Sequence, residues 1–227
     1  MQQLRPKATN EKPASSMLPD AVQRLIGYSK RHGLSSIVGR AVTLARRALF
    51  QRRFVVYLCD LKSLPSRSPA TALPGHLQVS RVTRFEDIPE RDWLKIISDR
   101  TPAICRKTFH QRFEQGSTLW LIHHSGQPAG YGWTIAGRTI DPFYFRLENG
   151  DVHFFDFMVF AEHRGKQVNP NLVNFILSEL AREGWTRAYI DVAEWNAPQF
   201  ASLAKTFFQR LGFARKPSWF SPASVEW

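Results

Sequence analysis

A basic turn between a predicted strand and a predicted helix is the part of this chain best suited to bind phosphate. It reads Arg164-Gly165-Lys166-Gln167-Val168-Asn169 and follows the apolar stretch VHFFDFMVF. The first N–H groups of a helix lack intrahelical partners and carry a partial positive charge, so such a turn can hold a pyrophosphate. Arg164 and Lys166 add positive charge. The alternative interpretation is a basic turn that only caps a core helix.

The helix after this turn is predicted over residues 170–182, with an apolar face that indicates burial. Asn169 is a favourable N-cap residue. Pro170 suits the first helical turn, because the N–H that proline lacks is not needed there.

Strands and helices alternate along the chain after residue 76, which predicts α/β layering around one sheet of mixed direction. Strand patterns occupy residues 54–61, 76–85, 118–124, 128–137, 152–160 and 186–193, and a short strand is expected after Leu211-Gly212-Phe213. Helical patterns occupy residues 86–99, 107–114, 170–182 and 198–209.

The N-terminal part of the chain differs in composition from the rest. Residues 1–16 are polar and predict a flexible tail. Residues 17–61 predict a basic amphipathic helical arm, although its last eight residues have the composition of a strand. Residues 62–75 contain three prolines and predict a linker. Residues 76–227 then form the main domain.

The net charge of +12 is concentrated at the N-terminus, since residues 1–60 carry +8 and residues 61–227 carry +4. A basic field favours anionic partners, which include nucleic acid, acidic phospholipid, a nucleotide-linked sugar and the phosphates of a cofactor. The arginine-rich second half of the arm predicts either a helix on an anionic membrane surface or a helix packed on the main domain.

The lengths of the apolar runs and the spacing of the cysteines bear on whether the protein is membrane-spanning, secreted or metal-binding. No apolar run approaches the roughly 18 residues of a membrane-spanning helix, and residues 1–10 lack the apolar core of a signal peptide. The main body is therefore expected to be soluble and cytoplasmic, with membrane association possible through the arm. Cys59 and Cys105 lack the spacing of a disulfide framework or a zinc site, so we expect buried thiols and no metal.

Two segments resemble the signatures of the GNAT acetyltransferase superfamily. Those enzymes carry Gln/Arg-x-x-Gly-x-Gly/Ala between a central strand and the helix that holds the pyrophosphate of acetyl-CoA, and the turn from Arg164 to Asn169 falls in that place. Residues 159–165 (VFAEHRG) resemble the family's Val-x-Pro-Glu-x-Arg-Gly pattern except at the proline. Asn196 and Gly212-Phe213 occupy the positions of the second signature.

The resemblance covers residues 76 to about 220 and implies a GNAT-like α/β fold, in which helices flank a mixed central sheet. With the N-terminal part included, the fold class is a GNAT-like domain with a basic helical N-terminal arm. The resemblance also implies an N-acetyltransferase that uses acetyl-CoA, or a related acyl-CoA, as co-substrate. The residues that it places against this co-substrate are Met158, Val159, Arg164, Gly165, Lys166, Gln167, Val168, Asn169 and Asn196.

Transfer to a primary amine needs a group that accepts a proton and a group that polarises the thioester carbonyl. The resemblance gives the second role to a backbone N–H at Met158 or Val159. His153 is our first candidate for the base, since a histidine has an ordinary pKa of about 6.5. Asp156 would need its pKa raised by burial, and Glu162 ranks below both. No Cys or Ser has the setting of a nucleophile, so we expect direct transfer.

This sequence departs from the family pattern at three positions. Gln167 and Asn169 stand where the phosphate-binding turn has small residues, which reduces the freedom for close backbone approach. Phe208 stands where many members have a tyrosine that protonates the departing thiolate. Tyr131, Tyr144 and Tyr189 are the tyrosines that could replace it.

The acceptor is expected to be a small-molecule amine, and a nucleotide-linked amino sugar fits the positive field. Nucleic acid is not the expected partner. Two other functions remain open: an acyl-CoA-binding module without catalysis, and a membrane or nucleic-acid adaptor that acts through the basic arm.

Overall fold

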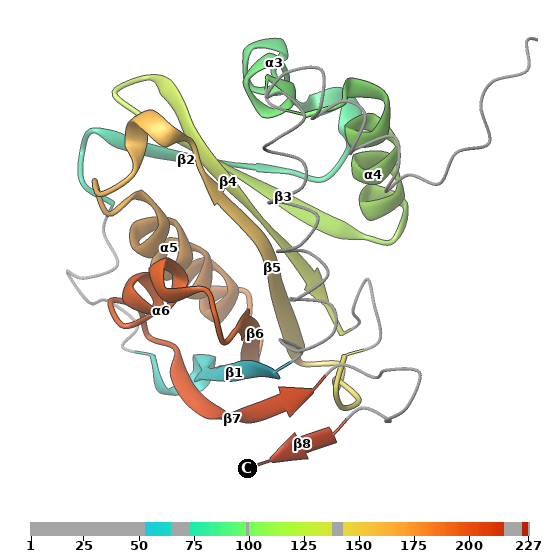
Figure 1. Cartoon of the computed structure of the whole chain (residues 1–227), viewed down its shortest axis with the longest axis vertical. Coiled ribbons are helices and arrows are strands. Elements are labelled where there is room, and N and C mark those ends of the chain that lie inside the picture. The colour runs from blue at the N-terminus through green and yellow to red at the C-terminus, as the bar shows by residue number, and fades with distance from the viewer. Residues whose placement is uncertain (1–52, 65–72, 99, 138–142, 216–223, 227) are drawn as a thin grey trace, which may run out of the picture. The chain divides into compact units, whose positions relative to one another are not determined.

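The computed structural model describes residues 53–64, 73–98, 100–137, 143–215 and 224–226. These residues form one eight-stranded sheet with helices on both faces (Figure 1). The predicted α/β layering around a sheet of mixed direction is therefore confirmed. None of the helices in these ranges is both long enough and apolar enough to cross a bilayer.

The strands in chain order are β1 (Arg53–Asp60), β2 (Leu77–Val82), β3 (Ser117–His124), β4 (Gln127–Ala136), β5 (Asp151–Val159), β6 (Arg187–Ala193), β7 (Gln209–Arg215) and β8 (Ser224–Glu226). The α-helices are α3 (Glu90–Ile97), α4 (Pro102–Glu114), α5 (Val168–Arg182) and α6 (Ala197–Leu203). Short 3-10 helices are η1 (Leu61–Ser63), η3 (Phe85–Asp87) and η4 (Ala161–His163).

The spatial order of the strands is β2-β3-β4-β5-β6-β1-β7-β8. Among the described strands, β5 and β6 form the one parallel pair, and the remaining neighbours are antiparallel. A parallel pair needs a crossover connection, and α5 supplies it between β5 and β6.

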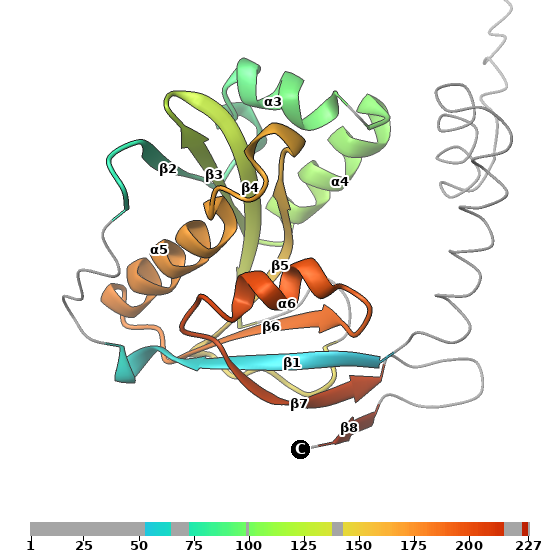
Figure 2. The ribbon, with the colours of Figure 1, turned by 60° about the vertical axis from the view of Figure 1, so that its left-hand side comes forward.

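Strand β1 lies inside the sheet, between β6 and β7 (Figure 2). Tyr57 pairs with Ile190 of β6 on one side and with Arg210 of β7 on the other. The side chain of Val56 is completely buried. Residues 53–61 thus belong to the main domain and not to an N-terminal arm, so this part of the predicted boundary is wrong.

The error has a physical reason: a proline-rich stretch marks a loop, and a loop can connect two strands of one sheet as well as two domains. The predicted tail at residues 1–16, the remainder of the arm at residues 17–52 and the linker residues 65–72 lie outside the described residues.

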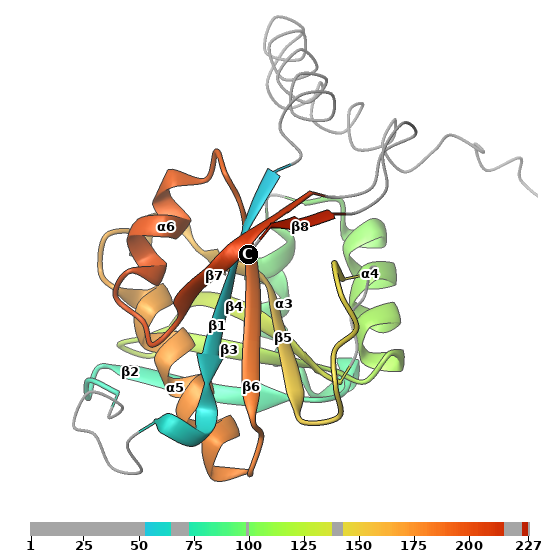
Figure 3. The ribbon, with the colours of Figure 1, turned by 90° about the horizontal axis from the view of Figure 1, so that it is seen from below.

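Helices α5 and α6 lie on one side of the sheet and α4 on the other (Figure 3). Each face of the sheet has its own apolar core. On one face, α5 buries Leu172, Val173, Ile176 and Leu177 against the central strands. On the other face, Phe109 of α4 packs against Trp133 of β4, with ring centroids 4.9 Å apart. Both cysteines are buried, as predicted, and burial raises the pKa of the Cys59 thiol to about 12.

All four α-helices differ from their predicted bounds: α3 is shorter at both ends, and α5 begins two residues early, at Val168. Helix α4 begins at Pro102, five residues before the predicted start, and proline is well tolerated in a first turn. Helix α6 ends at Leu203 and not at Gln209, because the chain must turn to enter β7. As a result, Gly212 and Phe213 lie in β7, where they pair with β1.

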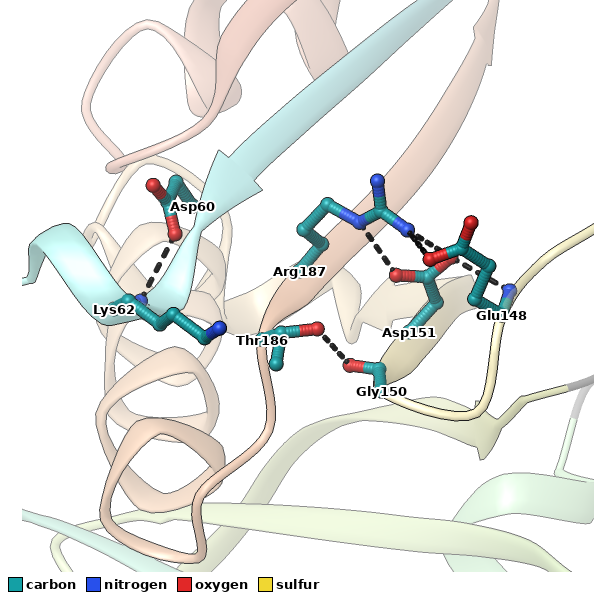
Figure 4. Close-up of polar contacts among 7 residues, drawn as sticks. All are labelled: Asp60, Lys62, Glu148, Gly150, Asp151, Thr186 and Arg187. Atoms are coloured by element: carbon teal, nitrogen blue, oxygen red, sulfur yellow. Dashed lines mark hydrogen bonds and ion pairs between the residues drawn. The ribbon is translucent and has the colours of Figure 1, made fainter.

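A polar clamp joins the beginnings of β5 and β6 (Figure 4). Arg187 Nε donates to Asp151 Oδ1 at 2.7 Å, and its Nη2 reaches Glu148 Oε2 at 2.6 Å. The Thr186 hydroxyl donates to the Gly150 carbonyl oxygen at 2.8 Å. The carboxylate of Asp151 is buried, so this clamp holds the two strands together at their N-terminal ends.

Candidate functional site

The parallel strands β5 and β6 pair only over their first four residues, from Asp151 with Arg187 to Phe154 with Ile190. Strand β5 continues to Val159 and β6 continues to Ala193, but the ladder between them does not. The two strands therefore part at their carboxyl ends. In open α/β sheets this is the place where ligands bind.

A β-bulge in β5 lies just beyond this parting point. The register against β4 shifts between Tyr131 and Trp133, and Asp156 has a positive φ of 49°. Because the bulge adds one residue to β5, the side chains after it lie on the opposite faces of the sheet from those that strict alternation would give. Phe154, Phe157 and Val159 consequently pack on the α5 side, whereas Phe155 and Met158 pack on the side of α3 and α4. Met158 and Val159, the predicted thioester contacts, thus lie on the part of β5 that pairs with β4 but no longer with β6.

The turn from Arg164 to Gln167 connects η4 to α5 at this end of the sheet. Gly165 has a φ of +77°, and a Cβ at this position would meet no other atom within 4 Å. The open space beside Gly165 and the N-terminal N–H groups of α5 fit a pyrophosphate. Arg164 and Lys166 lie in the same turn, as predicted.

Gln167 takes the backbone conformation that a glycine would take. It is the N-cap residue of α5 and is left-handed, with φ 57° and ψ 20°. A left-handed conformation costs a residue with a side chain roughly 1–2 kcal/mol. Gln167 therefore adopts, at some cost, a conformation that glycine adopts without strain.

Asn169 is not the N-cap residue that the sequence predicted, because α5 begins at Val168. Its side chain is buried, and Nδ2 donates to the Ser202 hydroxyl of α6 at 2.8 Å. Asn169 thus links α5 to α6, the helices that follow β5 and β6. Pro170 lies in the first turn of α5, as predicted.

Asn196 is the N-cap residue of α6. Its Oδ1 accepts a hydrogen bond from the Gln199 N–H at 3.4 Å. This contact gives Asn196 a structural role in setting the start of α6. A contact with the co-substrate stays a prediction.

His153 lies on the face of β5 opposite α5, in the segment that still pairs with β6. Its Nε2 is 3.1 Å from Asp191 Oδ1, and its Nδ1 is buried without a hydrogen-bond partner. The Tyr144 hydroxyl donates to the other oxygen of Asp191 at 3.1 Å. His153 is therefore the end of a buried chain of polar groups.

Asp156 is held in an ion pair with Arg112 of α4, with Oδ2 and Nη1 2.6 Å apart. The guanidinium of Arg112 also lies over the rings of Trp133 and Phe155, at 5.1 and 5.2 Å from their centroids. Phe155 stacks on His153 at 5.6 Å. The ring of Phe155 thus lies between the two candidate bases, and each of them has its own charged partner.

Glu162, the third candidate, binds Lys95 of α3 at 2.5 Å. This hydrogen bond lowers the pKa of the Glu162 carboxyl. A carboxylate stabilised in this way accepts a proton less readily, which supports its low rank.

The position of the usual tyrosine acid is occupied by Phe208, which is buried against Phe154 with ring centroids 5.3 Å apart. Burial raises the pKa of Tyr131, Tyr144 and Tyr189. Each of these hydroxyls is therefore a weaker acid than an exposed tyrosine.

Two partners of the candidate bases, Asp191 and Arg112, and one neighbour of Met158, Arg100, were missed by the sequence analysis. Asp191 was detectable, because it is an acidic residue inside the apolar strand TRAYIDVA. Arg112 and Arg100 carry no such signal, since arginine is common on helices and in loops. Arg100 Nη2 lies 3.4 Å from Met158 Sδ. Within the described ranges, no three His, Cys, Asp or Glu side chains converge as metal ligands would.

Comparison with family models gives one match, to the acetyltransferase (GNAT) family, over residues 82–213. The matched segment holds both the Arg164 turn and Asn196. No match was found among curated proteins.

Solved structures share the fold at low identity. The chain is 18% identical to a tandem GNAT protein from the clavulanic acid biosynthesis pathway, with a TM-score of 0.52 and coverage of 77% of this chain and 57% of that one. It is 12% identical to a GNAT-family acetyltransferase from Colwellia psychrerythraea, with a TM-score of 0.51 and coverage of 76% and 58%. The chain thus spans little more than half the length of these proteins. The GNAT-like fold class is confirmed.

Proposed function

Because the chain belongs to the GNAT acetyltransferase family, we propose that it is an acyl-CoA-dependent N-acyltransferase. In this proposal it transfers the acetyl group of acetyl-CoA to a primary amine of a small molecule. The observation that carries the proposal is the turn at Arg164–Gln167, which enters α5 at the end where β5 and β6 part.

The groups proposed to bind the co-substrate come from β5, from the turn and first residues of α5, and from the start of α6. The turn and the first N–H groups of α5 would hold the pyrophosphate, with Arg164 and Lys166 adding charge. Met158 and Val159, which pair with β4 but not with β6, would lie along the arm that carries the thioester, and Asn196 would border it from the start of α6. Acetyl-CoA supplies an acyl group that is already activated as a thioester.

His153 is the base that we propose ahead of Asp156. Oδ2 of Asp156 is engaged by Arg112 at 2.6 Å, whereas Nδ1 of His153 has no partner. A neutral imidazole can accept the proton of an attacking amine near pH 7. Since Phe208 cannot donate a proton, the thiolate would leave unprotonated or take its proton from water.

The acceptor that we propose is a small amine, and a nucleotide-linked amino sugar would be attracted by the net charge of +12. A cytoplasmic location is part of the proposal, because acetyl-CoA is made and used there. Binding of the basic residues 1–52 to an anionic membrane would be additional to this activity.

Calorimetry with acetyl-CoA and longer acyl-CoAs tests the co-substrate first, before any acceptor is known. Absence of binding to every acyl-CoA would overturn the proposal. Release of CoA is then followed over a panel of small amines, with amino sugars included. Binding without release on the whole panel would favour the non-catalytic module.

Variants then assign the base and test the missing acid. His153→Gln is expected to reduce CoA release by about 10²–10⁴-fold, the usual range for loss of a general base. Asp156→Asn is expected to reduce it less. Phe208→Tyr restores the family's proton donor and is expected to raise the rate where departure of the thiolate limits it.

A further inference from the structure

A chain of three polar side chains crosses the sheet face opposite α5. The Tyr144 hydroxyl donates to Asp191 Oδ2 at 3.1 Å, and Asp191 Oδ1 lies 3.1 Å from His153 Nε2. The three residues come from three segments: the loop before β5, β6 and β5 itself. Their convergence is thus a product of the fold.

The surroundings of this chain are mostly aromatic. The ring of Phe143 lies 4.8 Å from the imidazole of His153, and Phe155 stacks on it at 5.6 Å. The His153 side chain is 9% exposed and that of Asp191 is 16% exposed. Hydrogen bonds in such a setting are stronger than in water and fix geometry more firmly.

The hydrogen bonds determine which imidazole nitrogen carries the proton. An ionised carboxylate only accepts hydrogen bonds, so Nε2 of a neutral His153 must be the protonated nitrogen. The lone pair then lies on Nδ1, the atom that is buried without a partner. In a neutral imidazole, the nitrogen that is not hydrogen-bonded to a carboxylate is the one free to accept a proton.

We propose that Asp191 and Tyr144 are positioning residues that hold His153 with Nδ1 as the proton acceptor. This inference rests on the proposed function. As the amine nitrogen bonds to the acyl carbon and the carbon–sulfur bond breaks, the amine proton moves to Nδ1 and CoA leaves as the thiolate. Asp191 stabilises the imidazolium that forms and remains ionised.

Each member has a separate task in this arrangement. Asp191 sets the tautomer and supplies the negative charge. Tyr144 holds the second carboxylate oxygen, which prevents Asp191 from turning away from the ring. Phe143 packs against the imidazole, with ring centroids 4.8 Å apart.

Two further ionisable sites of the described residues lie near His153. Tyr189 pairs with it across the β5–β6 ladder, and the Arg112–Asp156 ion pair lies beyond the ring of Phe155. Asp191 is the acidic side chain within hydrogen-bond distance of His153.

The first test reads the tautomer in the free protein by ¹⁵N NMR of the histidine side chains. The spectrum of His153→Gln identifies the signal of His153. The wild-type protein is expected to show the Nε2–H tautomer, and Asp191→Asn is expected to show a mixture, since an amide can either donate or accept. An Nδ1–H tautomer in the wild type would overturn the proposal.

The second test is the pH dependence of CoA release. Asp191→Asn should lower kcat on the order of a hundredfold and move the acid limb of the profile to lower pH, because the imidazolium loses its counterion. The KM for acetyl-CoA should not change. Tyr144→Phe should lower kcat less and leave the limb in place. Asp87→Asn, which changes an exposed carboxylate on η3, is the control.

An unchanged acid limb in Asp191→Asn would overturn the positioning role even if kcat fell. The two tests also separate this inference from the proposed function. If the wild-type protein released no CoA with any amine, the proposed function would fail, while the NMR tautomer would still decide whether Asp191 orients His153.

Discussion

The phenyl ring of Phe157 lies against the Cα of Gly132, where a Cβ on residue 132 would overlap the ring. The bulge at Asp156 turns Phe157 toward α5, where its ring stacks with that of Phe154 at 5.8 Å. The absence of a side chain at residue 132 therefore gives the bulge the space that it needs.

Gly132→Ala is accordingly expected to destabilise the protein by about 1–3 kcal/mol, the usual cost of overpacking a core. It should also weaken acyl-CoA binding, because the bulge precedes Met158 and Val159. Chemical denaturation and calorimetry measure the two effects. Gly75→Ala is the control, since a Cβ there meets nothing within 4 Å. If Gly132→Ala and Gly75→Ala were equally stable, the bulge would be able to rearrange around the added methyl group.

Removal of β1 is expected to prevent folding. A chain that begins at residue 74 loses Val55, Val56, Cys59 and Leu61, all of which are buried. Each such aliphatic side chain contributes about 1.5–3 kcal/mol, against a total stability of about 5–15 kcal/mol. The loss also leaves β6 and β7 without the partner between them. Circular dichroism and thermal unfolding report the outcome.

A chain that begins at residue 53 is the matched control, and we expect it to fold and to bind acyl-CoA. Cooperative unfolding of the shorter chain would contradict the role assigned to β1. Failure of the control would instead show that residues 1–52 complete the core.

Gly165→Val is expected to weaken acyl-CoA binding at least tenfold. A β-branched residue is strained at a φ of +77° and fills the space next to the turn. Gly184→Val is the control, because Gly184 has a φ of +87° with nothing within 4 Å and follows the other end of α5. Both variants should lose stability, but only Gly165→Val should lose affinity in calorimetry. If Gly165→Val and Gly184→Val bound acyl-CoA with equal affinity, the turn would not be part of the binding site.

Gln167→Gly is expected to leave acyl-CoA affinity unchanged or to raise it. Glycine adopts the left-handed conformation of this residue without strain, although it loses more entropy on folding. The two effects are of similar size, so the free energy of unfolding should change by less than about 1 kcal/mol. A large loss of affinity would show that the Gln167 side chain itself contacts the co-substrate.

Acidification is expected to destabilise the protein through His163, which lies in η4 next to the turn. Burial, assisted by the positive charge of Lys166, lowers the pKa of His163 below its ordinary value. The unfolded chain then binds more protons than the folded one near pH 6, so stability rises with pH. The contribution of neutral His163 to the free energy of unfolding is complete above about pH 6.5, the ordinary pKa of histidine, and decreases as the pH falls below that value.

Urea denaturation between pH 5 and pH 8 measures this dependence. His163→Gln should flatten the profile. His124 and His76 are adjacent, with ring centroids 5.4 Å from His163 to His124 and 4.9 Å from His124 to His76. His76→Gln is therefore the control for a general histidine effect, and an unchanged slope in His163→Gln would exclude His163 as its source.

The sequence predicted most strands because their apolar runs are local signals. The strand at residues 54–61 was also detected, but its position between β6 and β7 was not, because pairing between distant segments leaves no trace in either one alone. The turn at Gly165 was also predicted from a local signal, because its residues are adjacent in the sequence and lie between a strand pattern and a helix pattern. The left-handed Gln167 and the burial of Asn169 were not, since both depend on contacts between the turn, α5 and α6. The bond from Asp191 to His153 likewise exists only after β5 and β6 have paired.

The position of β1 also affects how the chain folds during synthesis. Tyr57 leaves the ribosome long before its partners Ile190 and Arg210, which follow much later in the sequence. Until then β1 is an apolar strand with two unsatisfied edges, and pairings between distant segments form slowly. We therefore expect the sheet to close only after β6 and β7 have both been synthesised. A chaperone that shields extended apolar segments would protect this protein during that interval.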